Sequence, residues 1–118
     1  MKYLCLVYFE GKMLDGWSEA EKLKLDKDSV EYNEALERSG HFIVAQALES
    51  VESAVTVKMR NGKISTTDGP FAETKEQLGG FILIEARDLN DAIQVAAKIP
   101  LARSGSIEVR PILELERK

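Results

Sequence analysis

The hydrophobic and polar positions change period along the chain, and each change predicts a new element. Residues 2–9 and 81–86 are apolar on both faces, which is typical of strands in the middle of a sheet. Residues 41–48 also read as a strand. Residues 107–112 alternate apolar and charged side chains, as expected of a half-exposed edge strand, where Pro111 is tolerated.

Apolar residues at helical spacing predict two helices. Ser18, with Glu21 three residues later, forms a capping-box signature, so a helix begins there. Its helical pattern continues to Arg38. Asp88 caps a second helix, which Pro100 ends.

The first helix carries two apolar stripes on roughly opposite sides of its wheel. One stripe consists of Ala20, Leu23 and Val30, and the other of Leu25, Tyr32 and Leu36. Only one of them can face the sheet. The other requires a kink near residues 26–29, a loop that folds over it, or a second subunit, and we favour the last two.

A β-hairpin is indicated by Asn61-Gly62, the strongest short-range signal for a tight turn between two strands. This turn sets Met59 opposite Ile64. The residues that then share one face are Val55, Val57, Met59, Ile64 and Thr66. We expect this face to be buried.

The connection after the hairpin begins with a rigid corner. Asp68 and Gly69 favour a turn, and Pro70 fixes the direction in which the chain leaves it. Residues 72–78 have the composition of a short helix, with Gly79 placed as its left-handed stop.

Two interpretations of this connection stay open. In the first, it is an ordered connector: Asp68 caps a turn, Phe71 plugs the core, and Glu73, Lys75 and Glu76 lie on a solvated face. In the second, the rigid corner presents Asp68, Glu73 and Lys75 to a cavity, because sites are often built on loops held by a rigid scaffold.

The order strand, helix, strand, hairpin, strand, helix, strand predicts an α+β domain with a ferredoxin-like βαββαβ core and an inserted β-hairpin. Both helices then cover one face of an antiparallel sheet. The other face is bare unless something packs on it. Burying Tyr3 and Val7 there by sheet-to-sheet pairing predicts a homodimer with two-fold symmetry.

Length and composition narrow the class of protein. The 118 residues suit a single domain spanning 1–118, and the hydrophobic content of 44% is ordinary for a soluble globular protein. A net charge of −4 with dispersed basic residues argues against a nucleic-acid partner. No apolar run approaches the roughly 20 residues that cross a bilayer, and residues 1–10 lack the pattern of a cleaved signal. We therefore expect no membrane association and a cytoplasmic location.

The few cysteines and histidines limit metal and cofactor chemistry. Cys5 is the only cysteine, which rules out an internal disulfide and a cysteine-based metal cluster within one chain. It lies in an apolar strand, so a buried, inert thiol is favoured over a nucleophile. No Walker-type or Rossmann-type glycine fingerprint is present. We expect neither a metal nor a cofactor.

Three residues are candidates for catalysis or ligand binding: Asp68 in the connection, and His41 and Arg103 outside it. His41 is the only side chain whose unperturbed pKa, about 6.5, suits general acid or base catalysis near neutral pH. Its position at a strand start equally suits a structural histidine, and Asp68 is its natural partner if both line one cleft. Arg103 is either a surface arginine or a bidentate ligand for a carboxylate. Ser104 and Ser106 have no base beside them in sequence, so a serine nucleophile is unsupported there.

The segment DGPFAETKEQLGGF, residues 68–81, resembles the signature of the YCII-related family, in the branch often called DGPF-domain proteins. The resemblance continues through IEARDLNDAIQVAAKIP and ARSGSIEVRP and includes KYLCLVYFE near the start, so it covers nearly the whole chain. It implies a ferredoxin-like dimeric α+β barrel. It implies no reaction, because most members of the family have none assigned.

The resemblance has one departure that bears on mechanism. Some YCII-related proteins resemble enzymes with a histidine on the first helix, and this chain has no histidine between Ser18 and Arg38. His41 with Asp68 is then only a local substitute. One YCII-like branch is associated with dechlorination of small aromatic compounds, but no named reaction is carried over.

Three hypotheses follow. The first is a homodimer that binds or transforms a small molecule in a pocket between sheet and helices, edged by His41, Asp68, Phe71, Glu73, Lys75 and Arg103. The second is an accessory or regulatory module that acts through protein contacts, because DGPF-domain proteins are often encoded beside extracytoplasmic-function sigma factors. In the third, the motif is only a signature of the fold.

Overall fold

The computed structural model of the chain describes residues 1–115, and its strands and helices follow the predicted order. The strands are β1 (Lys2–Phe9), β2 (Phe42–Ala47), β3 (Val55–Arg60), β4 (Lys63–Asp68), β5 (Gln77–Glu85) and β6 (Ser106–Pro111). The helices are α1 (Glu19–Arg38) and α2 (Leu89–Ala97). Three 3₁₀ turns connect them: η1 (Gly11–Gly16), η2 (Val51–Ser53) and η3 (Pro100–Arg103).

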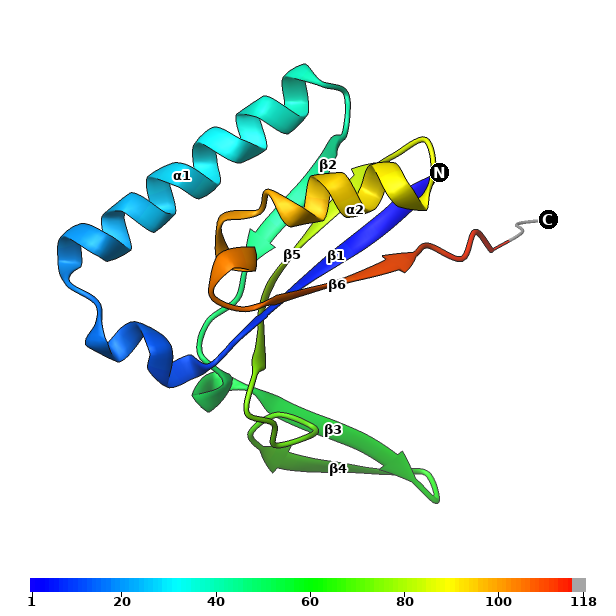
Figure 1. The fold of residues 1–118 in the computed structure, drawn as a ribbon. Coiled ribbons are helices and arrows are strands. Elements are labelled where there is room, and N and C mark those ends of the chain that lie inside the picture. Colours follow the sequence, from blue (N-terminus) through cyan, green and yellow to red (C-terminus); the bar gives the residue numbers. More distant parts are fainter. Residues whose placement is uncertain (116–118) are drawn as a thin grey trace.

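Four strands form one sheet in the order β2-β5-β1-β6, and each pair of neighbours is antiparallel. The two middle strands, β5 and β1, are those that are apolar on both faces. The remaining strands, β3 and β4, pair only with each other and project from one end of the sheet (Figure 1). The ferredoxin-like α+β fold with an inserted hairpin is thereby confirmed.

The core lies between the sheet and the two helices. Cys5 and Ile84, from the two central strands, are fully buried, and burying a side chain such as that of Ile84 contributes about 1.5 to 3 kcal/mol. The remaining buried hydrophobic residues are Tyr3, Val7, Leu36, Ile82, Ala86, Ala92, Val95, Ala96 and Ile99.

The prediction that Tyr3 and Val7 face away from the helices is wrong. Both are buried in the core beneath the helices together with Cys5. A strand that is apolar on both faces does not reveal which set of alternate residues faces which side, and the helices cover the odd-numbered residues of β1. The bare face carries the half-buried Leu4 and Leu6 instead. Their partners Leu83 and Phe81 on β5 lie on the same face.

The hairpin has the predicted register but its apolar face is not buried. Met59 pairs with Ile64, and Asn61 and Gly62 both adopt positive φ, as a two-residue turn requires. The side chains of Val55, Val57, Met59 and Ile64 are nevertheless exposed, Ile64 to 70%. The hairpin extends beyond the helices, so no element of residues 1–115 covers this face (Figure 1).

The predicted short helix over residues 72–78 is also wrong. Residues 69–76 form bends and irregular structure, and Gln77 already begins β5, where it pairs with Phe9. The ladder to β1 outweighs the helical preference of so short a stretch, because isolated short helices are marginal. Gly79 is therefore no left-handed stop. It is the extra residue of a bulge, since Val7 pairs with Gly80 and Tyr8 with Leu78.

The helix α1 is continuous from Glu19 to Arg38, and its capping box forms as predicted from Ser18 and Glu21. Its contacts with the core lie in its C-terminal half, where Leu36 is buried. The stripe that contains Leu23 and Val30 is exposed. Neither helix within residues 1–115 is long and apolar enough to cross a membrane.

Candidate functional site

A hollow of about 200 Å³, here called the α1 hollow, lies between α1 and the helix-covered face of the sheet. The sheet side of the hollow is built from small residues, among them Ala45, Ala47, Gly79 and Gly80. Ile82, Ile99 and Leu101 are further apolar residues in its lining. An apolar cavity with a few polar groups is the usual form of a small-molecule site.

Ser29 and Asn33 of α1 bring polar groups to this apolar hollow. They are four residues apart, so they lie one above the other on the same face of the helix. Both are half-buried. The α1 side chains that form hydrogen bonds are those of Glu21, Lys24, Asp28 and Tyr32; within residues 1–115 the hydroxyl of Ser29 and the amide of Asn33 form none.

Sequence reasoning missed these two residues, although a signal was present. They interrupt the stripe of Leu25, Tyr32 and Leu36 that faces the body of the protein. Ser and Asn are usually exposed on a helix that packs against a sheet. Two polar residues one turn apart on the packed side therefore indicate a role for polar side chains at this place.

The glycine pair at the end of the DGPF segment lines the hollow and lets neighbouring groups approach the backbone closely. A Cβ on Gly80 would lie 2.8 Å from the backbone oxygen of Gln46, and one on Gly79 would overlap the ring of Phe9. Both positions therefore require glycine. The bulge at Gly79 bends β5 at the same point, and bulges of this kind are common next to sites.

A second hollow, of about 220 Å³, lies on the other side of Gly79. Its walls come from η1, the start of β5 and the link between β2 and β3. Glu49, Ser50 and Gln77 provide its polar groups among mainly apolar neighbours. Gly79 belongs to the lining of both hollows.

The predicted site residues of the DGPF loop line neither hollow. Phe71 is 81% exposed, and Lys58 Nζ lies 5.7 Å from the centre of its ring. Lys75 Nζ is 3.3 Å from Glu10 Oε1, and Glu73 is exposed. Asp68 is exposed at the end of β4, opposite Val55. The expectation that Phe71 plugs the core is not met in the single chain.

His41 lies at the other end of the molecule and does not meet Asp68. It precedes β2 in the loop after α1, whereas β4 lies on the projecting hairpin (Figure 1). The Nε2 atom of His41 is 3.1 Å from Asp91 Oδ2, and its Nδ1 atom is 2.7 Å from Ser39 Oγ. The sequence did not indicate Asp91 as the partner, because the two residues are 50 positions apart.

Asp91 is held by the start of α2. Its carboxylate accepts a hydrogen bond from the backbone N–H of Arg87 at 3.0 Å, and its side chain is 11% exposed. This backbone bond, together with the bond from His41, lowers the pKa of Asp91 below its ordinary value. Asp91 therefore stays ionised at neutral pH.

Two further pKa values report burial. Desolvation raises the pKa of the Cys5 thiol to about 11, so Cys5 is a buried thiol with little thiolate at neutral pH. Desolvation also raises the pKa of Tyr32 to about 12, and its hydroxyl donates a 2.6 Å hydrogen bond to the backbone oxygen of Val95. Tyr32 thus stays protonated and joins α1 to α2.

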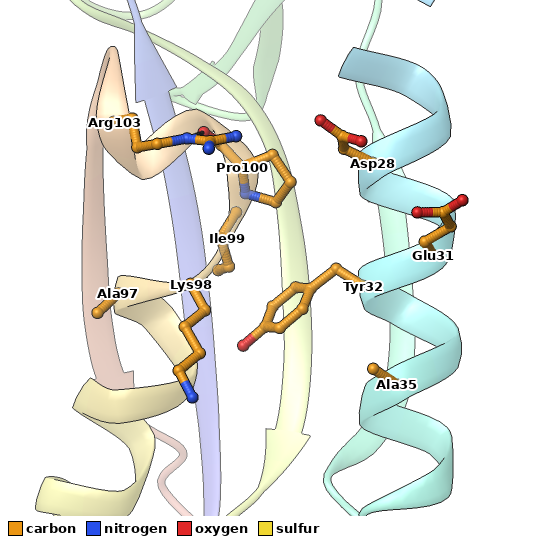
Figure 2. Close-up of a pocket in the computed structure, with 9 residues that line it drawn as sticks. All are labelled: Asp28, Glu31, Tyr32, Ala35, Ala97, Lys98, Ile99, Pro100 and Arg103. Carbon is orange, nitrogen blue, oxygen red and sulfur yellow. Dashed lines mark hydrogen bonds between the residues drawn. The ribbon is translucent and has the colours of Figure 1, made fainter. Parts of the chain in front are cut away.

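Arg103 lines a third depression, an open groove of about 500 Å³ between α1 and the α2–η3 segment. Figure 2 shows Asp28 and Glu31 on the α1 side of this groove and Lys98 and Arg103 on the other. The Nε atom of Arg103 donates a long, 3.4 Å hydrogen bond to the backbone oxygen of Pro100. The structure therefore separates Arg103 from the DGPF loop.

Residues 1–115 contain no group of three or more His, Cys, Asp or Glu side chains placed to hold a metal ion. The residues that the sequence indicated thus lie at three separate places: the hairpin and DGPF loop, the α1–η3 groove, and the His41–Asp91 pair. Of the DGPF segment, only its C-terminal part, residues 77–81, reaches a hollow.

Comparison with known proteins finds similarity along nearly the whole chain. The family model described as the YCII-related domain matches residues 1–116. An uncharacterised protein of Rhizobium meliloti (strain 1021) is 33% identical over 114 residues, which cover 95% of this chain and 92% of that protein. Both matches span nearly the full domain. The chain belongs to the YCII-related family.

Proposed function

We propose that the domain acts as a homodimer that binds a small, mainly apolar molecule in the α1 hollow, at the end of the DGPF segment. The observation that carries this proposal is the pair Ser29 and Asn33, whose polar groups face an apolar hollow without protein partners in residues 1–115. Both side chains are half-buried, so their polar groups are accessible from the hollow. A ligand hydroxyl or carbonyl group would satisfy them.

The size of the hollow favours a ligand with a single ring. A protein cavity of about 150 Å³ accepts benzene, and the α1 hollow measures about 200 Å³. The remaining volume suits one or two polar substituents. The lining of Ala45, Ile82 and Leu101 offers apolar contact on the other sides.

The geometry supports binding more than catalysis at this place. Ser29 and Asn33 do not titrate near neutral pH, and no acid or base side chain belongs to the lining. His41, the candidate general base, lines other depressions. The role of the α1 hollow is therefore to hold a ligand.

The homodimer is supported by the bare face of the sheet. Leu4, Leu6, Phe81 and Leu83 form an apolar cluster on the face away from the helices, and they are only partly buried in the single chain. Contact with the same face of a second chain would complete their burial. A two-fold axis allows this, because each chain then offers the same patch.

Calorimetric titration with phenol, a single ring with one hydroxyl, tests the binding proposal. The wild type should bind phenol, and Asn33→Leu should abolish binding because leucine removes the amide and takes up part of the hollow. The melting midpoint of Asn33→Leu should equal or exceed that of the wild type. Asn90→Leu, the same substitution at an exposed position of α2, is the matched control. Equal heats for wild type and Asn33→Leu would reject the proposal.

A second candidate function is an accessory module that contacts another protein. The exposed apolar face of the hairpin, with Val57, Met59 and Ile64, favours it, since contiguous exposed apolar residues often mark interaction surfaces. The resemblance to DGPF-domain proteins points to an extracytoplasmic-function sigma factor as the partner. Capture of a sigma factor by wild type but not by Met59→Lys would support this function, and equal capture by both would count against this surface.

A further inference from the structure

Three side chains at the C-terminal end of α1 form a chain in the order hydroxyl, imidazole and carboxylate. Ser39 Oγ lies 2.7 Å from His41 Nδ1. His41 Nε2 lies 3.1 Å from Oδ2 and 3.3 Å from Oδ1 of Asp91. A nucleophile within hydrogen-bond reach of a base, with the base oriented by a third group, is the arrangement that activates a serine.

The hydrogen bonds determine which nitrogen of the neutral imidazole carries the proton. The carboxylate of Asp91 can only accept, so Nε2 carries the hydrogen and donates it to Asp91. Nδ1 is then left with its lone pair and accepts from the Ser39 hydroxyl. The other acceptor near that hydroxyl, the backbone oxygen of Leu36, is farther away at 3.1 Å. Ser39 has one hydroxyl proton, so it is activated when that proton points to Nδ1 instead of to the Leu36 oxygen.

The base and its carboxylate are held in place, whereas the hydroxyl is accessible. The side chains of His41 and Asp91 are 23% and 11% exposed. Asp91 is fixed further by the backbone N–H of Arg87. Ser39 ends α1 at the surface and lines an open groove of about 410 Å³ together with His41, Arg87 and Asp91. A small substrate can reach the hydroxyl from this groove.

We propose that Ser39 and His41 are the catalytic residues of an esterase site, with Asp91 as the positioning residue, and that this site takes small carboxylic esters. Ser39 Oγ attacks the carbonyl carbon while its proton moves to His41 Nδ1. The imidazolium then protonates the leaving alcohol as the ester C–O bond breaks, which leaves the acyl group on Ser39. Water, deprotonated by the same nitrogen, attacks the acyl carbon, and the carboxylic acid leaves as the Ser39 hydroxyl is restored.

Arg87 complements this site. Its guanidinium group is exposed at the groove, with Nε 3.6 Å from Asp91 Oδ2. Arg87, Ser39 and His41 line the same groove, so a cation is available for the negative oxygen that develops on the attacked carbonyl. The site is separate from the α1 hollow, so it stands or falls independently of the proposed binding function.

A fluorophosphonate probe tests the nucleophile directly on the full-length wild type, because attack by Ser39 forms an O–P bond and expels fluoride. Peptide mass spectrometry should find the label on Ser39 and none on Ser104. Ser39→Ala should abolish the label, and His41→Ala should slow labelling by about 100-fold or more. Ser104→Ala, an exposed serine in the loop after η3, should leave labelling unchanged.

Hydrolysis of p-nitrophenyl acetate gives the second measurement. Asp91→Asn should lower both hydrolysis and labelling at least tenfold while its melting midpoint shows the protein to be folded, a loss that a merely structural carboxylate would not cause. An unlabelled Ser39 in the wild type overturns the proposal, whatever the variants do. Wild-type rates of hydrolysis in Ser39→Ala, or in folded Asp91→Asn, also overturn it.

Discussion

At the scale of single residues, Asp91 joins three elements through one carboxylate. It accepts from the backbone of Arg87 at the start of α2, and it contacts His41, which in turn contacts Ser39 at the end of α1. The carboxylate of Asp91 suits the first turn of α2, because a negative charge is favourable near a helix N-terminus. The His41–Asp91 pair therefore has a structural role besides the proposed catalytic one.

The lowered pKa of Asp91 predicts how stability depends on pH. A carboxyl group whose pKa is lower in the folded state stabilises the fold above its unfolded pKa, about 3.9, and loses this contribution as the pH falls through the folded pKa. The difference in melting midpoint between wild type and Asp91→Asn should thus be present at pH 5 to 7 and shrink below about pH 4. Melting curves from pH 7 to pH 2 measure it, with the exposed Asp15→Asn as control. A difference that stays constant down to pH 2 would contradict the account.

Gly80 gives a prediction about the floor of the α1 hollow. A methyl group on Gly80 would lie 2.8 Å from the backbone oxygen of Gln46, so Gly80→Ala forces apart the pairing of β2 and β5. We expect a loss of about 1 to 3 kcal/mol in the free energy of unfolding, the usual cost of overpacking. Gly16→Ala, with no atom within 4 Å of the added carbon, is the matched control and should change little. Denaturant unfolding measures the free energy of unfolding of both variants. A loss in Gly80→Ala but not in Gly16→Ala is due to the steric clash, and not to the replacement of a glycine as such.

At the scale of elements, the two helices depend differently on their caps. Asp88 accepts from the backbone N–H of Asp91 and caps α2, which buries Ala92, Val95 and Ala96. Ser18 caps the end of α1 that lies far from its buried Leu36. A cap that anchors a packed turn should matter more than one that anchors an exposed turn.

We therefore expect Asp88→Ala to lower the free energy of unfolding by about 1 kcal/mol, which moves the melting midpoint by roughly 3 to 6 °C. Ser18→Ala should move it by less, because the first turns of α1 can fray with little loss of core contacts. Thermal melts of both variants measure the difference. A larger loss for Ser18→Ala would show that the N-terminal half of α1 is anchored more firmly than its exposure indicates.

The sequence predicted elements well where one local signal decides them. The capping residues Ser18 and Asp88 and the Asn61-Gly62 turn all act as their chemistry predicts, because these contacts lie within a few residues. The order of strands and helices along the chain followed from the changes in hydrophobic period. The helix predicted over residues 72–78 is wrong, because Gln77 and Leu78 pair with β1, about 70 positions away in the sequence.

The candidate site could not be predicted from sequence to the same extent. The two-sided apolar pattern of β1 hid which face carries Tyr3 and Val7, and nothing local brings His41 to Asp91. The polar pair Ser29 and Asn33 stands out in the sequence only once the packed side of α1 is known. Tertiary contact, rather than local preference, decides these features.

At the scale of the whole molecule, the bare face of the sheet predicts self-association. The mass of the chain is 13.2 kDa, so a homodimer should sediment at about twice that mass. Leu6→Glu places a charge in the middle of the apolar cluster and should yield a monomer. Val57→Glu, on the exposed face of the hairpin, serves as the control and should leave the dimer intact if the sheet face alone forms the interface. A wild type that sediments as a monomer at tens of micromolar would rule out this assembly.

Ligand binding in the α1 hollow is measured most directly by a ¹H–¹⁵N NMR titration of the wild type with phenol. The α1 hollow predicts shifts of the Gly79 and Gly80 backbone amide signals and of the Asn33 side-chain amide, all of which line it. In Asn33→Leu, which lacks the side-chain amide, the Gly79 and Gly80 signals should not respond. If the shifts cluster instead around Arg103 or His41, or if no signal moves, the α1 hollow is not the ligand site.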